Sequence, residues 1–89
     1  MPEYATIILT SDFVESYGGR EFSPAERQRF ARALRLLDSN EQHPSLRVHQ
    51  LTGKEKGTWS ASASDELRIT FERRADGTKV IFRCSRHYQ

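Results

Sequence analysis

Leu67-Arg68-Ile69-Thr70-Phe71 decides the fold, because apolar and polar side chains alternate strictly along this stretch. A period of two is typical of a β-strand that has one face in the core and the other in solvent. Leu67, Ile69 and Phe71 are therefore predicted to face the core. Arg68 and Thr70 then lie together on the opposite face.

Three further segments of strand character accompany this strand, which we expect to run to Arg73. They are residues 46–51, 59–63 and 79–84. The dipeptide Asp76-Gly77, between the last two strands, is typical of a tight hairpin turn. Segments that follow one another with short connections predict a small antiparallel sheet.

Alternation in residues 79–84 predicts which side chains of the last strand are buried. The apolar set that falls on one face is Val80, Phe82 and Cys84. Ile81 and Arg83 fall on the opposite face. Arg68 and Arg83 are thus expected to share one exposed face of the sheet.

The N-terminal half predicts a strand followed by two helical segments. Residues 4–10 are β-branched and apolar, which is typical of a strand covered on both faces, and residues 12–17 predict a short helical turn that stops at Gly18-Gly19. Ser23-Pro24-Ala25-Glu26 is typical of a helix start with a capping box, and this helix should end near residues 38–40. Apolar residues recur along it at helical spacing and predict its buried stripe: Phe30, Ala33, Leu34 and Leu37.

Length and composition indicate one small domain that spans residues 1–89. The formal net charge is +2 and the excess of basic residues lies in residues 43–89, which favours an anionic partner such as nucleic acid. Cys84 is the single cysteine, so no intrachain disulfide can form, which is typical of a reducing cytoplasm. No apolar run approaches a membrane span, so we expect a cytoplasmic protein with no membrane association.

Four short motifs, in this order, resemble the RelE/ParE superfamily of toxins from type II toxin–antitoxin systems. They are Leu51-Thr52-Gly53, Trp59-Ser60, residues 67–71 and His87-Tyr88. The ending Cys84-Ser85-Arg86-His87-Tyr88 is similar to that of the YoeB branch, and His49-Gln50-Leu51-Thr52-Gly53 is similar to the YafQ branch. The resemblance implies a RelE-like α+β fold, in which an N-terminal strand and a helical hairpin pack on a twisted antiparallel sheet of four to five strands.

The resemblance also implies an activity and a set of partners. The YoeB, YafQ and RelE branches are mRNA interferases, endoribonucleases that cleave mRNA on the ribosome through its 2′-OH, with no metal and no cofactor. Their partners would be a cognate antitoxin protein, the ribosome and mRNA, with operator DNA contacted only through the antitoxin complex. The protein would assemble as a homodimer or as a toxin–antitoxin hetero-oligomer. The alternatives are a ParE-like inhibitor of DNA gyrase and a catalytically inactive member that only binds its antitoxin.

The same resemblance assigns roles to residues near the C-terminus. His87 would be the general acid that protonates the leaving 5′-oxygen. Arg68 would clamp the scissile phosphate with its planar guanidinium. Arg83 and Arg86 compete for a second cationic role, and Arg86 is otherwise a contact to the RNA backbone. Tyr88 would stack on a base or bind a phosphate.

The general base is less clearly marked. The YoeB branch has a glutamate where this chain reads Gln42-His43-Pro44-Ser45-Leu46, and no carboxylate is in register. His49 is the best substitute by its similarity to the YafQ branch. Lys54 and Lys56 are expected to bind phosphate or to replace acid–base groups, as lysines do in RelE. Arg47 is a further expected contact to RNA.

Overall fold

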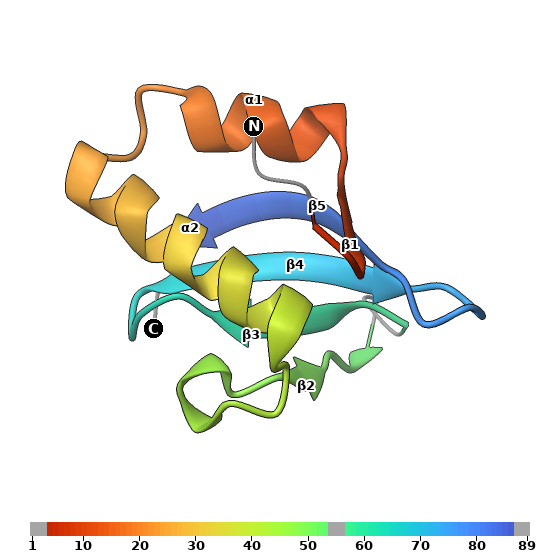
Figure 1. Cartoon of the computed structure of the whole chain (residues 1–89). Coiled ribbons are helices and arrows are strands. Elements are labelled where there is room, and N and C mark those ends of the chain that lie inside the picture. The colour runs from red at the N-terminus through yellow and green to blue at the C-terminus, as the bar shows by residue number, and fades with distance from the viewer. Residues whose placement is uncertain (1–3, 54–56, 87–89) are drawn as a thin grey trace.

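The computed structural model describes residues 4–53 and 57–86, so Lys54, Lys56, His87 and Tyr88 lie outside the described residues. Figure 1 shows the arrangement of the elements. In chain order they are β1 (Ile7–Leu9), α1 (Ser11–Gly18), α2 (Pro24–Ser39), the 3₁₀ turn η1 (Pro44–Leu46), β2 (His49–Gln50), β3 (Trp59–Ser62), β4 (Leu67–Arg73) and β5 (Lys79–Arg86).

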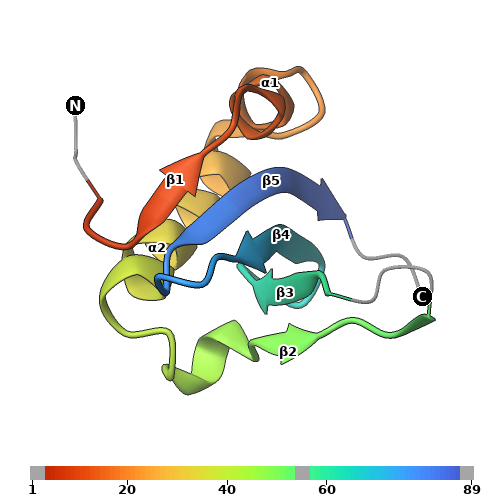
Figure 2. The same ribbon diagram turned by 90° about the vertical axis from the view of Figure 1, so that its right-hand side faces the viewer.

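The strands form one sheet in the order β1-β5-β4-β3-β2. In Figure 2, β1 lies to the left of β5, and β4, β3 and β2 follow below β5. Strands β2 to β5 are antiparallel, as the sequence predicts, whereas β1 adds to β5 in parallel. Helix α1 packs along β5 and α2 crosses β3 and β4, so both helices cover the same face of the sheet. The predicted α+β fold with helices packed on a small sheet is confirmed.

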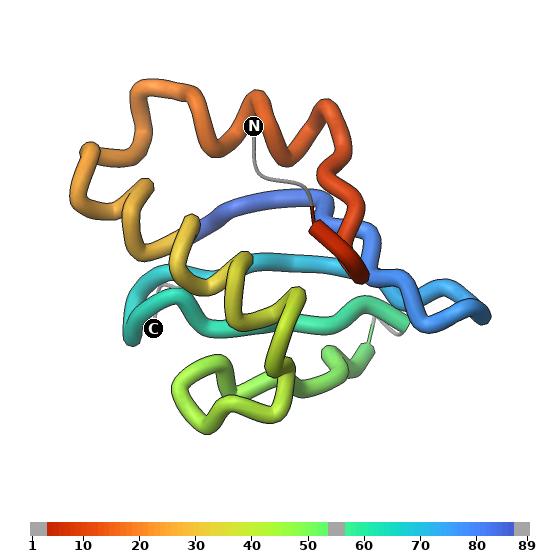
Figure 3. Tube along the Cα trace, viewed as in Figure 1, coloured from red at the N-terminus to blue at the C-terminus, as the bar shows by residue number. Residues whose placement is uncertain are grey.

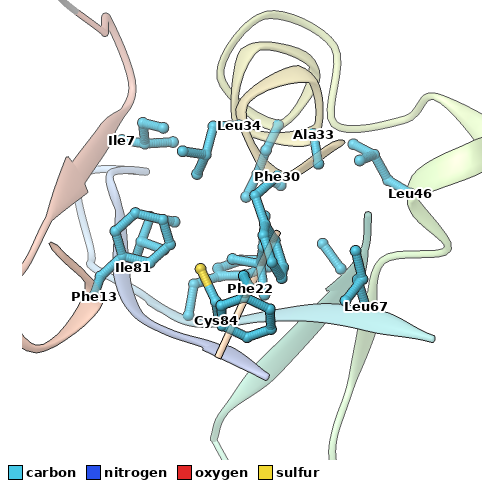
Figure 4. Packing of buried hydrophobic residues seen from close by; sticks show 14 residues of the cluster. Ile7, Phe13, Phe22, Phe30, Ala33, Leu34, Leu46, Leu67, Ile81 and Cys84 are labelled. Carbon is cyan, nitrogen blue, oxygen red and sulfur yellow. The ribbon is translucent and has the colours of Figure 1, made fainter. Parts of the chain in front are cut away.

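Helix α2 begins where its sequence predicts. The Glu26 N–H donates to Ser23 Oγ (3.2 Å) and the Ser23 N–H donates to Glu26 Oε1 (2.9 Å), which completes the capping box. The predicted stripe is buried, and Figure 4 shows three of its members, Phe30, Ala33 and Leu34, among the other core residues. Loss of a buried aromatic such as Phe30 typically costs about 3–5 kcal/mol of stability, so this stripe anchors the helix to the sheet.

Strand β4 alternates as predicted. Leu67, Ile69 and Phe71 are at most 1% exposed and belong to the core, whereas Arg68 and Thr70 are half-buried on the other face. The β4–β5 hairpin turns at the predicted dipeptide, where Gly77 has a φ of 90° that glycine adopts without steric cost. Its loop projects beyond the sheet in Figure 3.

Strand β5 contains a β-bulge at Phe82 that the sequence does not announce. Thr70 of β4 pairs with Arg83, but the next residue, Phe71, pairs with Ile81. Two pairs that are one residue apart on β4 are therefore two residues apart on β5, and Phe82 is the extra residue. A bulge of this kind shifts the inward and outward alternation by one position.

The bulge corrects part of the prediction for this strand. Cys84 is buried and Arg83 is exposed, as predicted. The placement of Val80 and Phe82 in the core is wrong, because upstream of the bulge it is Ile81 that is buried, at 0% exposed. The prediction assumed that side chains alternate without interruption back from Cys84. The extra residue reverses which residues face the core at the positions before the bulge.

Two of the expected strands are also shorter or more open than their sequences suggest. Strand β1 was expected to be covered on both faces, but Ile7 is 6% exposed and Ile8 is 42% exposed, because the helices cover only one face. The segment 46–51 pairs only over His49–Gln50, since η1 occupies its start. Arg47, which follows η1, adopts a left-handed conformation (φ 46°) that breaks an extended chain.

Candidate functional site

The sheet face opposite the helices, called the outer face below, carries two rows of polar side chains. Residues directly opposite each other on neighbouring strands present their side chains to the same face. The first row is His49, Ser60, Thr70 and Arg83, and the second row is Ser62, Arg68 and Ser85. The fold thus brings three of the predicted site residues, His49, Arg68 and Arg83, onto one surface.

His49 is held in one orientation by a backbone contact. Its Nδ1 lies 2.9 Å from the carbonyl oxygen of Arg47. A carbonyl oxygen can only accept, so Nδ1 carries the hydrogen and, in the neutral ring, Nε2 has the free lone pair. The side chain is exposed. His49 therefore presents a proton acceptor, and the same carbonyl would stabilise the ring once it is protonated.

Arg47 contributes to this arrangement through its backbone rather than through a strong side-chain pair. Its left-handed conformation ends η1 and precedes the strand that carries His49. The guanidinium lies 3.8 Å from the Asp65 carboxylate, but the two side chains are 67% and 92% exposed. An exposed pair of this length contributes little to stability, so the Arg47 side chain is free to bind an anion.

Arg68 is anchored at one end of its guanidinium. Nη1 donates to the carbonyl oxygens of Ser64 (2.7 Å) and Leu67 (3.2 Å). None of the ion pairs formed among residues 4–53 and 57–86 involves Arg68, and the neighbouring Glu66 and Glu72 do not pair with it. An oriented guanidinium with spare donors on a sheet face is suited to a phosphate.

Arg83 is the diagonal neighbour of Arg68 across the β4–β5 pair. Arg68 lies opposite Ser85, two residues beyond Arg83, and such diagonal positions are about 7–8 Å apart. Arg83 is exposed, and in the described part of the chain no carboxylate pairs with it. Arg68 and Arg83 are therefore two cationic side chains on neighbouring strands of the outer face.

Arg86, the other candidate for the second cation, points to the opposite side of the sheet. It pairs with Leu67, a core-facing residue, and its Nη2 donates to Glu26 Oε1 (2.8 Å) and to the carbonyl of Glu21 (2.9 Å). Its guanidinium also lies 5.2 Å from the centre of the Phe22 ring. Arg86 therefore ties the end of β5 to the start of α2, and Arg83 is the arginine on the outer face.

This tie predicts a dependence of stability on acid. The hydrogen bond from Arg86, followed by that from the Ser23 backbone, lowers the pKa of Glu26 to about 2, against an ordinary value of 4.5. Because the folded pKa is the lower one, the stabilisation is complete above about pH 4.5 and is lost as the pH falls towards 2. Glu26→Gln should therefore flatten the fall of the melting temperature between pH 5 and pH 3, measured by circular dichroism. Glu72→Gln, an exposed carboxylate on the outer face, is the matched control, and an equal flattening in it would contradict the tie.

Ser60 and Ser62 are site features that sequence reasoning missed. They are only 5% and 6% exposed, and they lie on β3 in the two rows, Ser60 opposite His49 and Ser62 opposite Arg68. The signal was present in the sequence, since residues 59–62 alternate as a strand and Ala61 falls on the core face.

Other chemistries find little support in residues 4–53 and 57–86. Burial raises the pKa of the Cys84 thiol to about 12, so it is not a thiolate nucleophile near neutral pH. Within these residues, no group of three or more His, Cys, Asp or Glu side chains is arranged to hold a metal ion. Their helices are also too short and too polar to cross a membrane.

Comparison with solved structures identifies the fold. The YoeB/ParE toxin from Agrobacterium tumefaciens matches with a TM-score of 0.71 and 16% identity over 94% of this chain and 100% of that chain. YafQ from E. coli matches with a TM-score of 0.70 and 14% identity over 91% of each chain. The YoeB–YefM complex from Staphylococcus aureus matches with a TM-score of 0.68 and 18% identity over 92% of this chain and 95% of that chain.

No family model and no curated protein matches the sequence. The structural likeness spans nearly the whole chain, and it shows that this protein has the RelE-like fold of the YoeB and YafQ toxins. At this level of identity the likeness defines the architecture, and the function has to be argued from the site.

Proposed function

We propose that this protein is the toxin of a type II toxin–antitoxin pair and that it cleaves mRNA on the ribosome. The observation that carries the proposal is the outer face, where β2, β4 and β5 present His49, Arg68 and Arg83 on one surface of the sheet. Cleavage of RNA through its 2′-hydroxyl requires a proton acceptor and cations that stabilise the phosphorane. The outer face offers His49 as the acceptor, and Arg68 and Arg83 as two cations that form no ion pair within the described residues.

His49 is the general base in this mechanism. Its Nε2 takes the proton of the 2′-hydroxyl, and the freed oxygen attacks the adjacent phosphorus. The bond from phosphorus to the 5′-oxygen then breaks, which leaves a 2′,3′-cyclic phosphate that water can open. The Arg47 carbonyl, which accepts from His49 Nδ1, stabilises the charged ring that forms.

Arg68 and Arg83 stabilise the phosphorane, whose extra negative charge develops between them. The leaving 5′-oxygen needs a proton, and we assign that role to His87, which follows Arg86 directly in the chain. The assignment rests on the resemblance to the YoeB ending together with the position of β5, whose last residue is tied to α2. Tyr88 is assigned to stack on a base or to bind a phosphate.

The remaining predicted contacts extend the RNA path. Arg47 is exposed next to His49, and Lys54 and Lys56 follow β2 in the chain. These cations would hold the RNA backbone on the side of the base, while Arg83 holds it on the side of β5. Binding of this kind depends on salt, because each phosphate contact releases counterions.

The proposal includes partners. The Staphylococcus aureus YoeB structure is a complex with YefM, and by analogy we expect a cognate antitoxin to bind this chain and to block its outer face. Operator DNA would be contacted only through that complex. A protein that acts on the ribosome would work in the cytoplasm, as a homodimer or as part of a toxin–antitoxin hetero-oligomer.

Primer extension on mRNA in programmed bacterial ribosomes tests this function. The purified protein should produce breaks in phase with the codon in the decoding site. His87→Ala should abolish those breaks, or lower their rate by about 10²- to 10⁴-fold, because the leaving oxygen loses its proton donor. Wild-type activity in His87→Ala would contradict the assigned general acid.

A parallel supercoiling assay separates this function from the alternative one. Inhibition of DNA gyrase without any mRNA cleavage would indicate a ParE-like protein and would contradict the proposal. A stable antitoxin complex without either activity would indicate a binding-only member, and it would contradict the proposal as well.

A further inference from the structure

Phe82, the bulged residue of β5, is a large aromatic side chain that does not belong to the core. It is partly exposed, and neither the core cluster nor the residues packed against that cluster include it. Together with Arg83, Asp12 and Ser16 it lines a cavity of about 450 Å³ between α1 and β5. The bulge therefore places an aromatic ring and an arginine in one opening at the edge of the outer face.

The backbone on both sides of this bulge is fixed to α1. The Thr10 hydroxyl and N–H both donate to the carbonyl of Ile81 (2.8 and 3.1 Å), and the Cys84 N–H donates to Ser16 Oγ (3.1 Å). These contacts flank Phe82 by one residue before and two residues after. The backbone that carries Phe82 is therefore preorganised, so little backbone entropy is lost when a ligand binds.

The outer face changes its chemistry at the same place. Val80 lies opposite Ile8 in the register of β1 and β5, and Ile8 is 42% exposed. Hydroxyl and cationic side chains thus occupy the rows that contain Arg83 and Arg68, and apolar side chains begin at Phe82. A surface that is cationic on one side and apolar on the other matches a nucleotide, which is a phosphate joined to an aromatic base.

We propose that Phe82 is a stacking platform for a nucleobase next to the phosphate held by Arg83. This inference rests on the proposed RNA cleavage and adds a residue that determines where the RNA lies. Asp12, on the α1 side of the cavity, repels a phosphate there. The phosphate is therefore directed towards Thr70 and Arg68, and the base towards α1. Phe82 positions the substrate and takes no part in proton transfer.

Loss of the ring should weaken substrate binding more than it slows the chemical step. Stacking of one base on an aromatic side chain corresponds to about a 5- to 150-fold change in affinity. Phe82→Leu should raise by that factor the protein concentration that gives half-maximal single-turnover cleavage in programmed ribosomes. The maximal rate should change much less. Phe82→Trp, which keeps a stacking surface, should retain wild-type behaviour, and a thermal melt checks that both variants are folded.

Abasic nucleotides placed one at a time around the cleavage site identify the base. At one position, removal of the base should raise the half-maximal concentration of the wild-type protein by the same factor as Phe82→Leu does. The two changes together should raise it no more than either change alone. The stacking site would be overturned if Phe82→Leu reached half-maximal cleavage at the wild-type protein concentration. It would also be overturned if the effects of Phe82→Leu and of base removal added at every position. Either result leaves RNA cleavage itself in place.

The same variants separate this inference from the proposed function. If the wild-type protein cleaves no RNA, fluorescence anisotropy with a single-stranded oligonucleotide, with and without the base, still reports on Phe82. Base-dependent binding that Phe82→Leu removes would support the platform while the nuclease proposal fails. Binding that ignores both the base and Phe82 would overturn the platform.

Discussion

Replacing His49 by glutamine should lower the single-turnover rate of mRNA cleavage by about 10²- to 10⁴-fold. Glutamine keeps a polar side chain of similar reach on the outer face, but it cannot accept a proton from the 2′-hydroxyl. The defect should lie in the maximal rate rather than in ribosome binding, because His49 acts on the reacting atoms. Quench-flow cleavage at saturating protein measures the maximal rate.

His43 provides the matched control for this change. The Ser45 N–H donates to His43 Nδ1 (3.2 Å), so in the neutral ring the hydrogen sits on Nε2, the reverse of His49. His43 caps η1 and lies outside the two rows of the outer face. His43→Gln should therefore cleave at close to the wild-type rate. An equal loss in both variants would mean that His49→Gln acts through the fold or through ribosome docking, and it would remove His49 as the base.

Replacing Arg68 by lysine should lower the cleavage rate by about 10²- to 10³-fold, although the charge is kept. The ammonium group of lysine is a point charge, and it cannot hold the Ser64 carbonyl and a phosphate with separate, oriented donors. The loss should appear in the maximal rate, because the contact strengthens as charge develops on the phosphorane. The same quench-flow assay, with thermal melting as a check on folding, measures it.

Arg74→Lys is the control for charge and for the arginine side chain. Arg74 is exposed in the β4–β5 hairpin loop, beyond the two rows of the site. Its replacement should leave the maximal rate unchanged. If Arg68→Lys also retains wild-type activity, cleavage does not depend on the guanidinium geometry. Arg68 would then contribute only its positive charge and would not clamp the phosphate.

Local sequence patterns predicted those parts of the fold that depend on residues close together in the chain. The Ser23–Glu26 capping box joins residues that are only three positions apart in the chain, so the start of α2 was predictable. The alternation of β4 was equally plain, because this strand is central in the sheet and one of its faces is fully buried. This alternation also predicted that Arg68 lies on the face of the sheet away from the core.

Features that depend on pairing between distant segments were not predictable. Nothing in residues 79–86 marks Phe82 as the bulged residue, because the bulge is set by register with β4 and by contacts of α1 on either side. The choice between Arg83 and Arg86 was open for the same reason. Only the three-dimensional contact of Arg86 with Glu26, 60 residues away in the chain, separates their roles.

The orientation of the His49 ring could not be predicted from the sequence for a different physical reason. It depends on a single carbonyl, that of Arg47, and on the left-handed backbone conformation at that residue. Such conformations are uncommon for residues other than glycine, and they cost energy that the surrounding structure must offset. The similarity to YafQ could suggest His49, but it could not show which ring nitrogen is available.

The most direct test of the central claim is cleavage of an mRNA whose decoding-site codon carries a 2′-deoxynucleotide in place of the nucleotide before the scissile bond. The wild-type protein, in programmed ribosomes, should cleave the all-ribose codon and leave a 2′,3′-cyclic phosphate or its opened product. It should not cleave the deoxy-substituted codon, because the outer face activates the 2′-hydroxyl as the nucleophile. Cleavage of both codons at similar rates, or of neither, would contradict the account.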